Sequence, residues 1–131
     1  MTTDLKYLVL TAMLTAALWI PYIVCQVRTN GAPQPKEYAD PSLPRPVPPW
    51  GLRAHRVYLN AIEVFAPFAA LVLAAQLAGK ANATTAFCAA SFFYLRLAHA
   101  IVYWAGLPYV RTVLFTLAFL AEVGIFWEVI R

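Results

Sequence analysis

The sequence predicts an all-α integral membrane protein, a four-helix transmembrane bundle, and two observations carry this prediction. Of its 131 residues, 62% are hydrophobic and only 12% are charged, whereas about a quarter of a typical soluble domain is charged. The apolar residues also gather into four runs, each long enough to cross a bilayer core of about 30 Å as a helix. The length fits one domain that covers residues 1–131.

The first predicted span covers residues 5–27. Its apolar run is too long for the central region of a signal peptide, and no small-residue cleavage motif precedes Gln26, so we expect a retained helix. Pro21 lies near one end of the run and should kink the helix there. The span then ends in a sequence with two polar residues, Gln26-Val27-Arg28.

Residues 29–50 form a different kind of segment that contains seven prolines. Because proline lacks a backbone N–H and its ring blocks helix continuation, we expect an extended loop. Trp50 at its end is typical of an anchor at the membrane–water interface, so the loop should lie on the membrane surface. Arg45 is interpreted as a solvated loop charge.

Three further spans are predicted at residues 52–79, 82–106 and 109–130. Very short turns separate them, which is typical of antiparallel helix pairs. Four spans place both termini on one side of the membrane and the long loop on the other. The loop side carries most of the basic residues, namely Arg28, Lys36, Arg45, Arg53, Arg56 and Arg111, and the terminal side carries Lys6, Lys80 and Arg131. This excess predicts that the long loop is cytoplasmic.

The second span carries a polar stripe on one helical face. Its members share an arc of roughly 80° on a helical wheel and are Arg53, Arg56, Asn60, Glu63 and Pro67. The other faces are apolar. A charge inside a bilayer is costly, so the stripe should face a protein interior or a wet cavity, and it is a candidate functional site.

The other spans bring polar side chains to the same depth. Arg96, His99 and Tyr103 share one face of the third span, Arg111 and Thr112 open the fourth, and the first span ends at Arg28. This layer contains five arginines and one carboxylate within the spans. Because arginine binds carboxylates in a bidentate manner, the layer favours a polyanionic small molecule such as a zwitterionic peptide with extra carboxylates.

Three motifs at these positions resemble the MAPEG superfamily, the membrane-associated proteins of eicosanoid and glutathione metabolism. They are Arg53-x-x-Arg56-x-x-Leu59-Asn60-x-x-Glu63-x-x-x-Pro67-Phe68, Arg96-x-x-His99-x-x-x-Tyr103 and Gly106-Leu107-Pro108-Tyr109-Val110-Arg111-Thr112. The resemblance covers all four spans. It implies a homotrimer of four-helix protomers, with glutathione as co-substrate bound between neighbouring subunits near the cytoplasmic face.

The resemblance also implies roles for individual residues. The glutathione-binding set would be Arg28, Arg53, Arg56, Asn60, Glu63, Arg96, His99 and Tyr103. Arg111 would stabilise the glutathione thiolate, with Thr112 beside it. The implied function is that of a glutathione transferase or peroxidase acting on small lipophilic electrophiles that arrive from the membrane lipid.

Several alternatives stay open. The polar stripe could be a salt-bridge network that only fixes the bundle, in a non-catalytic membrane protein that serves assembly or sensing. A transporter is a weaker third alternative, because four spans leave little room for alternating access. His99 has no partners at metal-ligand spacing, and Cys25 and Cys88 are expected to be buried inert thiols. The net charge of +4 needs no nucleic acid to explain it.

Glu122 lies deep in the fourth span, roughly 16 Å along the helix axis from Arg111. It is therefore too far to contact Arg111 within its own helix. We expect Glu122 to form an inter-helix hydrogen bond or to lie near a trimer axis.

Overall fold

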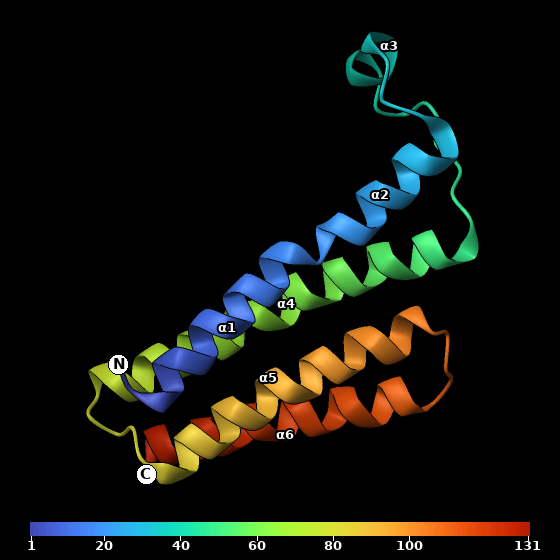
Figure 1. The fold of residues 1–131 in the computed structure, drawn as a ribbon. Coiled ribbons are helices and arrows are strands. Elements are labelled where there is room, and N and C mark those ends of the chain that lie inside the picture. The colour runs from blue at the N-terminus through green and yellow to red at the C-terminus, as the bar shows by residue number, and fades with distance from the viewer.

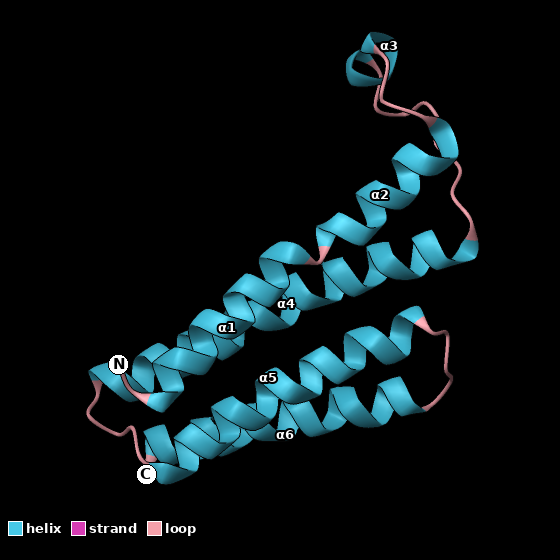
Figure 2. Cartoon of the chain, viewed as in Figure 1, coloured by secondary structure: helices cyan, strands magenta, loops and turns pink.

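Every regular element of the chain is an α-helix, as Figure 2 shows. The structure, a computed structural model, describes all 131 residues. Its helices are, in chain order, α1 (Thr3–Ala17), α2 (Trp19–Asn30), α3 (Pro35–Ala39), α4 (Pro49–Leu77), α5 (Ala83–Trp104) and α6 (Val110–Ile130).

Four helical segments are long and apolar enough to cross a membrane. They are α1 and α2 taken together, α4, α5 and α6. In Figure 1 the N and C ends of the chain lie at one end of the bundle, and the α3 segment and the turn between α5 and α6 lie at the other. The protein is therefore an integral, multi-pass membrane protein.

The first span is broken into two helices at Leu18, where α1 ends and α2 begins. The break lies three residues before Pro21. A proline cannot donate to the carbonyl four residues earlier, here that of Ala17, and its ring clashes with that carbonyl. Pro21 therefore disturbs the chain one turn upstream of itself, which accounts for the position of the break.

The proline-rich segment differs from the extended loop that its composition predicts. Residues 35–39 form α3, which projects from the bundle beyond the end of α2 (Figure 1). The expectation that Arg45 is a solvated charge was wrong. Its guanidinium forms an ion pair of 2.8 Å with Glu37 and donates to the Gln26 side chain and the Gly31 carbonyl, each at 2.8 Å. Arg45 thus ties α3 to the end of α2.

Helices α5 and α6 form the most extensively packed pair in the bundle. The main core cluster joins α1, α4, α5 and α6, and at its centre the rings of Phe68 and Phe92 stack with centroids 3.9 Å apart. A second, smaller cluster consists of Leu18, Val57, Ala61 and Ala100. It lies where α4 and α5 carry the polar residues singled out above.

Two glycines allow helices to approach each other closely. A Cβ atom on Gly51 of α4 would lie 2.5 Å from the sulfur of Cys25 in α2, and one on Gly124 of α6 would lie 2.7 Å from the sulfur of Cys88 in α5. Both distances are well below van der Waals contact. The two cysteines are free and buried.

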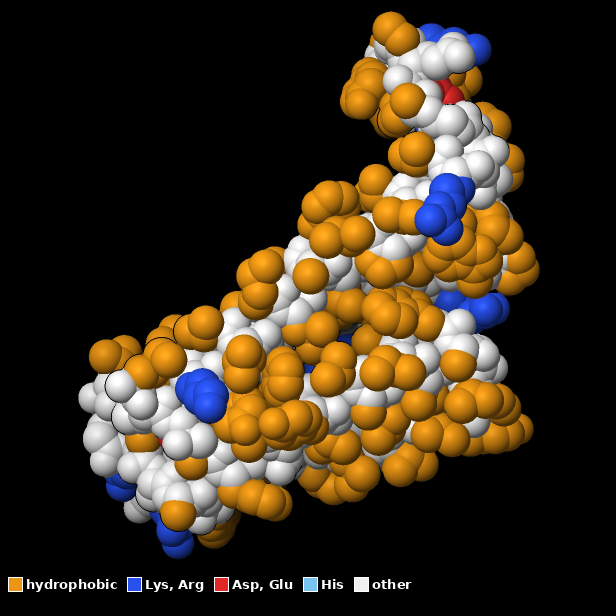
Figure 3. Space-filling view, in the orientation of Figure 1, with side chains coloured by type: hydrophobic (Ala, Val, Ile, Leu, Met, Phe, Trp, Pro, Cys, Tyr) orange, Lys and Arg blue, Asp and Glu red, His pale blue; other side chains and the backbone are white.

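Hydrophobic side chains cover most of the surface visible in Figure 3, and Lys and Arg side chains gather mainly toward the ends of the bundle. The exposed apolar set is large and draws on all four spans, including Val9, Met13, Ile23, Leu73, Ile101, Phe119 and Phe126. In water such a surface would promote aggregation. Around a membrane-spanning helix the same apolar side chains contact the hydrocarbon of the lipid, with which they are compatible.

Candidate functional site

An open groove lies along α4 at the end of the bundle that carries α3. Its volume is about 540 Å³, within the range of about 300–1,000 Å³ typical of ligand pockets. The lining residues are Leu52, His55, Arg56, Leu59, Asn60, Glu63 and, from α5, Tyr103. The α4 members follow the spacing of one helical face, so the helix period itself presents them to the groove.

The groove is charged although it lies on a membrane-spanning helix. Arg56 and Glu63 are both exposed on α4, seven residues or about 10 Å apart along its axis. Each carries a charge that lipid would solvate poorly. This face of the chain is therefore unsuited to lipid contact and suited to a polar ligand or to another protein surface.

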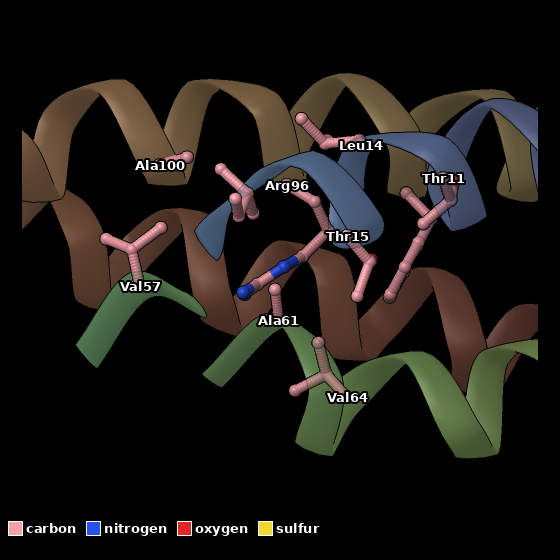
Figure 4. A pocket seen from close by; sticks show the side chains of 10 residues that line it. Thr11, Leu14, Thr15, Val57, Ala61, Val64, Arg96 and Ala100 are labelled. Carbon is pink, nitrogen blue, oxygen red and sulfur yellow. The ribbon is translucent and has the colours of Figure 1, made fainter. Parts of the chain in front are cut away.

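Arg96 of α5 contacts the groove residue Asn60 from the buried side of α4. The side chain is 4% exposed, and its Nη2 donates to Asn60 Oδ1 at 2.6 Å. Figure 4 shows this arginine extending from α5 toward α4, with its guanidinium beside Ala61. Because the oxygen of Asn60 is engaged, the Nδ2 group of this amide is the one available to donate to a ligand.

Tyr103 links the groove to two further polar side chains. The guanidinium carbon of Arg111 lies 4.5 Å from the centroid of the Tyr103 ring, a cation–π contact. His99 lies beside the same ring, 5.7 Å from Tyr103 between centroids, and its imidazole is 6.3 Å from the ring of Phe115. His99 is 3% exposed and does not line the groove.

The start of α6 sets the position of Arg111. Tyr109, the residue before the helix, has a φ of 64°, and a positive φ is uncommon for a non-glycine residue. Such outliers persist where the surrounding structure determines them. Here the conformation turns the chain into α6, and Arg111 follows in the first turn of the helix, where the helix dipole adds partial positive charge.

Arg53 has a different environment from its neighbour on the stripe. Its Nε donates to the carbonyl of Trp104 at 3.1 Å, so Arg53 caps the end of α5. Gly106 follows in a left-handed conformation with φ of 73°, and a Cβ on it would lie 3.4 Å from the guanidinium carbon of Arg53. Arg53 therefore stabilises the α5–α6 turn that leads to Arg111.

Two residues expected at the site lie apart from the groove lining within the protomer. Arg28 is exposed in the last turn of α2, and Thr112 is exposed in the first turn of α6. The fold of the single chain thus brings Arg56, Asn60, Glu63 and Tyr103 into one groove. Arg96, His99, Arg53 and Arg111 surround this groove without lining it.

Sequence reasoning missed His55 as a lining residue. Its imidazole stacks on Tyr22 of α2 with centroids 4.3 Å apart, while its other side borders the groove. The signal was present, because Leu52, His55 and Leu59 extend the face of Arg56, Asn60 and Glu63 by helical spacing. The stripe was limited to an arc of roughly 80°, and a wider arc would have included His55.

The geometry defines a class of protein: a helical, multi-pass membrane protein with a charged groove beside one end of its bundle. A comparison with protein-family models then identifies the family. The MAPEG family matches residues 5–131, nearly the whole chain, and the protein belongs to this family. No curated protein and no solved structure matches the chain.

Proposed function

We propose that the protein is a glutathione-dependent membrane enzyme, a transferase or peroxidase that acts on lipophilic electrophiles. MAPEG proteins are often glutathione-dependent membrane enzymes. The observation that carries the proposal for this chain is the groove of about 540 Å³ that presents Arg56, Asn60 and Glu63 along one face of α4.

The groove complements the charged groups of glutathione, which has two carboxylates, one ammonium group and one thiol. Arg56 offers a fork of N–H donors for a carboxylate. Asn60 offers its amide Nδ2, and Glu63 offers a carboxylate to the ammonium group. These groups lie within about 10 Å along α4, so one extended tripeptide could contact all of them.

Arg111 is the group we propose to activate the thiol. A positive charge close to a thiol favours the thiolate, which is the nucleophilic form. Tyr103 supports the guanidinium through its ring, and Thr112 follows at the next position. The thiol proton passes to water, and the thiolate sulfur then attacks the electrophilic carbon of the second substrate while the bond from that carbon to its leaving group breaks and the leaving group departs with the electron pair. With a hydroperoxide, the sulfur attacks the terminal oxygen, the O–O bond breaks and an alcohol leaves; a second glutathione then converts the sulfenic acid to the disulfide and water.

A homotrimer is part of this proposal. The groove is open in the protomer, and its Arg56 and Glu63 side chains are exposed on a spanning helix. A neighbouring subunit that covers this face would remove both charges from lipid and close the site. Arg28, which lies apart from the groove within one chain, would then join it from the neighbour.

A second candidate is a non-catalytic membrane protein in which the polar residues fix the bundle. Two observations favour it: Arg96 is bonded to Asn60, and Arg53 caps α5 at Trp104. Both contacts use arginine within the protomer without any ligand. They do not account for Arg56 and Glu63, which have no partner in the protomer and face the groove.

The thiolate absorbance of glutathione bound to the purified protein tests the proposal. We expect the wild type to bind glutathione and to show thiolate absorbance near neutral pH. Arg111→Ala and Arg111→Gln should retain binding, because other groups hold the carboxylates, and should lose both the thiolate signal and turnover. Arg111→Lys should recover part of the signal, since lysine keeps the charge without the fork.

The result that supports the non-catalytic alternative is equally specific. It is a wild-type protein that binds glutathione and shows no thiolate near neutral pH. A wild-type protein that binds no glutathione would reject the glutathione site as a whole.

A further inference from the structure

A small cavity inside the bundle holds two charged side chains of opposite sign. Its volume is about 30 Å³, and it is lined by Val64 of α4, by Phe92 and Arg96 of α5, and by Phe115, Ala118, Phe119 and Glu122 of α6. Arg96 and Glu122 are the polar members of this lining, and the others are apolar. The cavity is separate from the groove, and Arg96 connects the two, because it lines the cavity and donates to Asn60 of the groove.

Both charged side chains present an atom that lacks a partner in the protein. Arg96 Nη1 and Glu122 Oε1 are buried and form no hydrogen bond. The two side chains are only 4% and 9% exposed. Leaving a buried polar group unsatisfied is costly, and more so when the group is charged. Each atom therefore calls for a partner inside the bundle.

The depth of the pair excludes bulk water as that partner. Glu122 lies twelve residues into α6, about 18 Å along its axis, and Arg96 lies about 12 Å from the end of α5. Charges at such depth are normally paired with each other or placed in a water-filled cavity. The two side chains do not form a direct ion pair within 4.0 Å.

The size of the cavity identifies what can connect them. One water molecule needs about 10–15 Å³ of such volume and at least two polar partners. The cavity of about 30 Å³ offers that room, one donor atom and one acceptor atom. The second cavity beside Arg96, shown in Figure 4, is only about 10 Å³ and mostly apolar. It is the poorer place for a water.

We propose that one or two water molecules in this cavity bridge Arg96 Nη1 to Glu122 Oε1, so that Glu122 is the buried counter-charge of Arg96. The bridge continues to the groove, because Arg96 Nη2 holds Asn60 Oδ1 at 2.6 Å. A polar relay thus runs from α6 through α5 to α4. Glu122 is a positioning residue: it acts on the groove through Arg96 and Asn60.

A double-mutant cycle tests the pairing. Arg96→Leu and Glu122→Leu should each lower the thermal melting midpoint of the detergent-solubilised protein, because each leaves an opposite charge buried without its partner. The double variant should melt above both single variants, since it removes both charges together. Losses that simply add would overturn the bridge, because residues in one network show an interaction energy.

Glu128 provides a matched control. It is also a buried glutamate on α6, but it is bonded to Asn82 and Arg131. Combining Glu128→Leu with Arg96→Leu should therefore give additive losses. If the Arg96 and Glu128 substitutions show the same interaction as the Arg96 and Glu122 substitutions, the effect is not specific to the cavity and the proposal fails.

Infrared spectroscopy decides the question without a destabilising variant. Glu122→Gln keeps the shape and the polarity of the side chain and removes its charge. The difference between the wild-type and Glu122→Gln spectra should contain the band of an ionised carboxylate. A band of a protonated carboxylic acid in its place would overturn the proposal, because a neutral acid is not a counter-charge.

The effect on the groove rests on the proposed function and has its own measurement. Glu122→Gln should weaken glutathione binding several-fold, Glu122→Asp should restore part of the affinity, and Glu128→Gln should leave it unchanged. Unchanged affinity in Glu122→Gln would overturn the positioning role. If the wild type binds no glutathione, the proposed function fails, while the melting cycle and the infrared band still decide the bridge.

Discussion

Two arginines that lie one helical turn apart on α4 have different environments. Arg53 donates to the carbonyl of Trp104 and supports the end of α5. Arg56 is exposed, forms no hydrogen bond within the protomer and lines the groove. A helical wheel places both on one stripe, but the wheel contains no information about the neighbouring helix. The stripe therefore combines a structural residue and a candidate ligand-binding residue.

Substitution of these two arginines should separate stability from binding. Arg56→Ala should weaken glutathione binding by roughly 10- to 100-fold, the loss of one charge-assisted contact of about 1.5–3 kcal/mol, and leave the melting midpoint nearly unchanged. Arg53→Ala should lower the midpoint, because a carbonyl at the end of α5 loses its donor. Calorimetric titration and thermal melting of both variants measure the two effects.

Glu63→Gln completes this comparison, since it removes the only carboxylate of the groove. Its affinity for glutathione should fall, while its affinity for an analogue that lacks the amino group should not. Equal losses for both ligands would place the ammonium group elsewhere. Unchanged affinity in all three variants, with the fold intact, would favour the non-catalytic alternative.

At the scale of elements, the segment between α2 and α4 owes its order to one arginine. Arg45 joins Glu37, Gln26 and the Gly31 carbonyl, and its side chain is only 16% exposed. The backbone N–H of Gln34 and the guanidinium of Arg45 both lower the pKa of Glu37. Hydrogen bonds within the segment and to the last turns of α2, rather than packing against the other helices, hold α3 in place.

The order of α3 should therefore depend on pH. A carboxyl group whose pKa is lowered in the folded state contributes stability above its unfolded pKa, and this contribution is lost as the pH falls through the folded value. We expect α3 to be ordered at neutral pH and to loosen below a pH of about 4.3, the ordinary pKa of glutamate. Amide hydrogen exchange at residues 34–40, measured across this range, checks the expectation.

Glu37→Gln is the matched control for this experiment. At neutral pH its amides at residues 34–40 should be less protected than those of the wild type, and their protection, corrected for the pH dependence of intrinsic exchange, should not change further as the pH falls. The four spans should be unaffected in either protein. A wild-type exchange pattern that does not change with pH would show that Glu37 does not hold α3.

At the scale of the whole molecule, the two ends of the bundle carry different features. The proline-rich segment, the groove and the α5–α6 turn share one end, and the chain termini and the α4–α5 turn share the other (Figure 1). The excess of basic residues at the groove end predicts that this end faces the cytoplasm. Both native cysteines are buried, so introduced cysteines can report on each side.

Labelling of Lys36→Cys and Lys80→Cys in intact cells or oriented vesicles tests this topology. An impermeant thiol reagent should reach position 80 from outside the cytoplasm and position 36 only after the membrane is opened. The unmodified protein serves as the control for background labelling. Labelling of both positions from the same side would contradict four spans.

The oligomeric state is a separate prediction. We expect native mass spectrometry from a mild detergent to show a homotrimer, because a trimer would cover the charged face of α4. Glutathione should bind only to the trimer if neighbouring subunits complete the site. A monomer that binds glutathione as tightly as the wild-type assembly would contradict the intersubunit site.

How much the sequence could predict depends on the range of the interactions involved. The four long apolar helices follow from composition alone, and the break near Pro21 follows from one missing donor. The helix α3 and the role of Arg45 could not be predicted in this way, because they arise from contacts between residues 8 to 19 positions apart.

Part of the candidate site could likewise be predicted from the sequence, and part could not. The polar face of α4 was predictable from helical periodicity, and in the structure Arg56, Asn60 and Glu63 of this face line one groove. The bond from Arg96 to Asn60, the cap that Arg53 forms and the cavity beside Glu122 depend on how α4, α5 and α6 are rotated against each other. The pattern of residues along each helix does not give this relative rotation, which becomes visible only when the helices are packed in the structure.

The close contacts of Gly51 with Cys25 and of Gly124 with Cys88 have a consequence for how this sequence can change over generations. At either glycine, a larger residue becomes tolerable only after the facing cysteine has been exchanged for a smaller one. The order of the two substitutions is therefore constrained, because the reverse order passes through a protein in which the new side chain overlaps the cysteine sulfur. The two residues of each pair should therefore change together, and at Gly51 the side chain of Val47, 3.1 Å from the same Cβ position, is a further constraint.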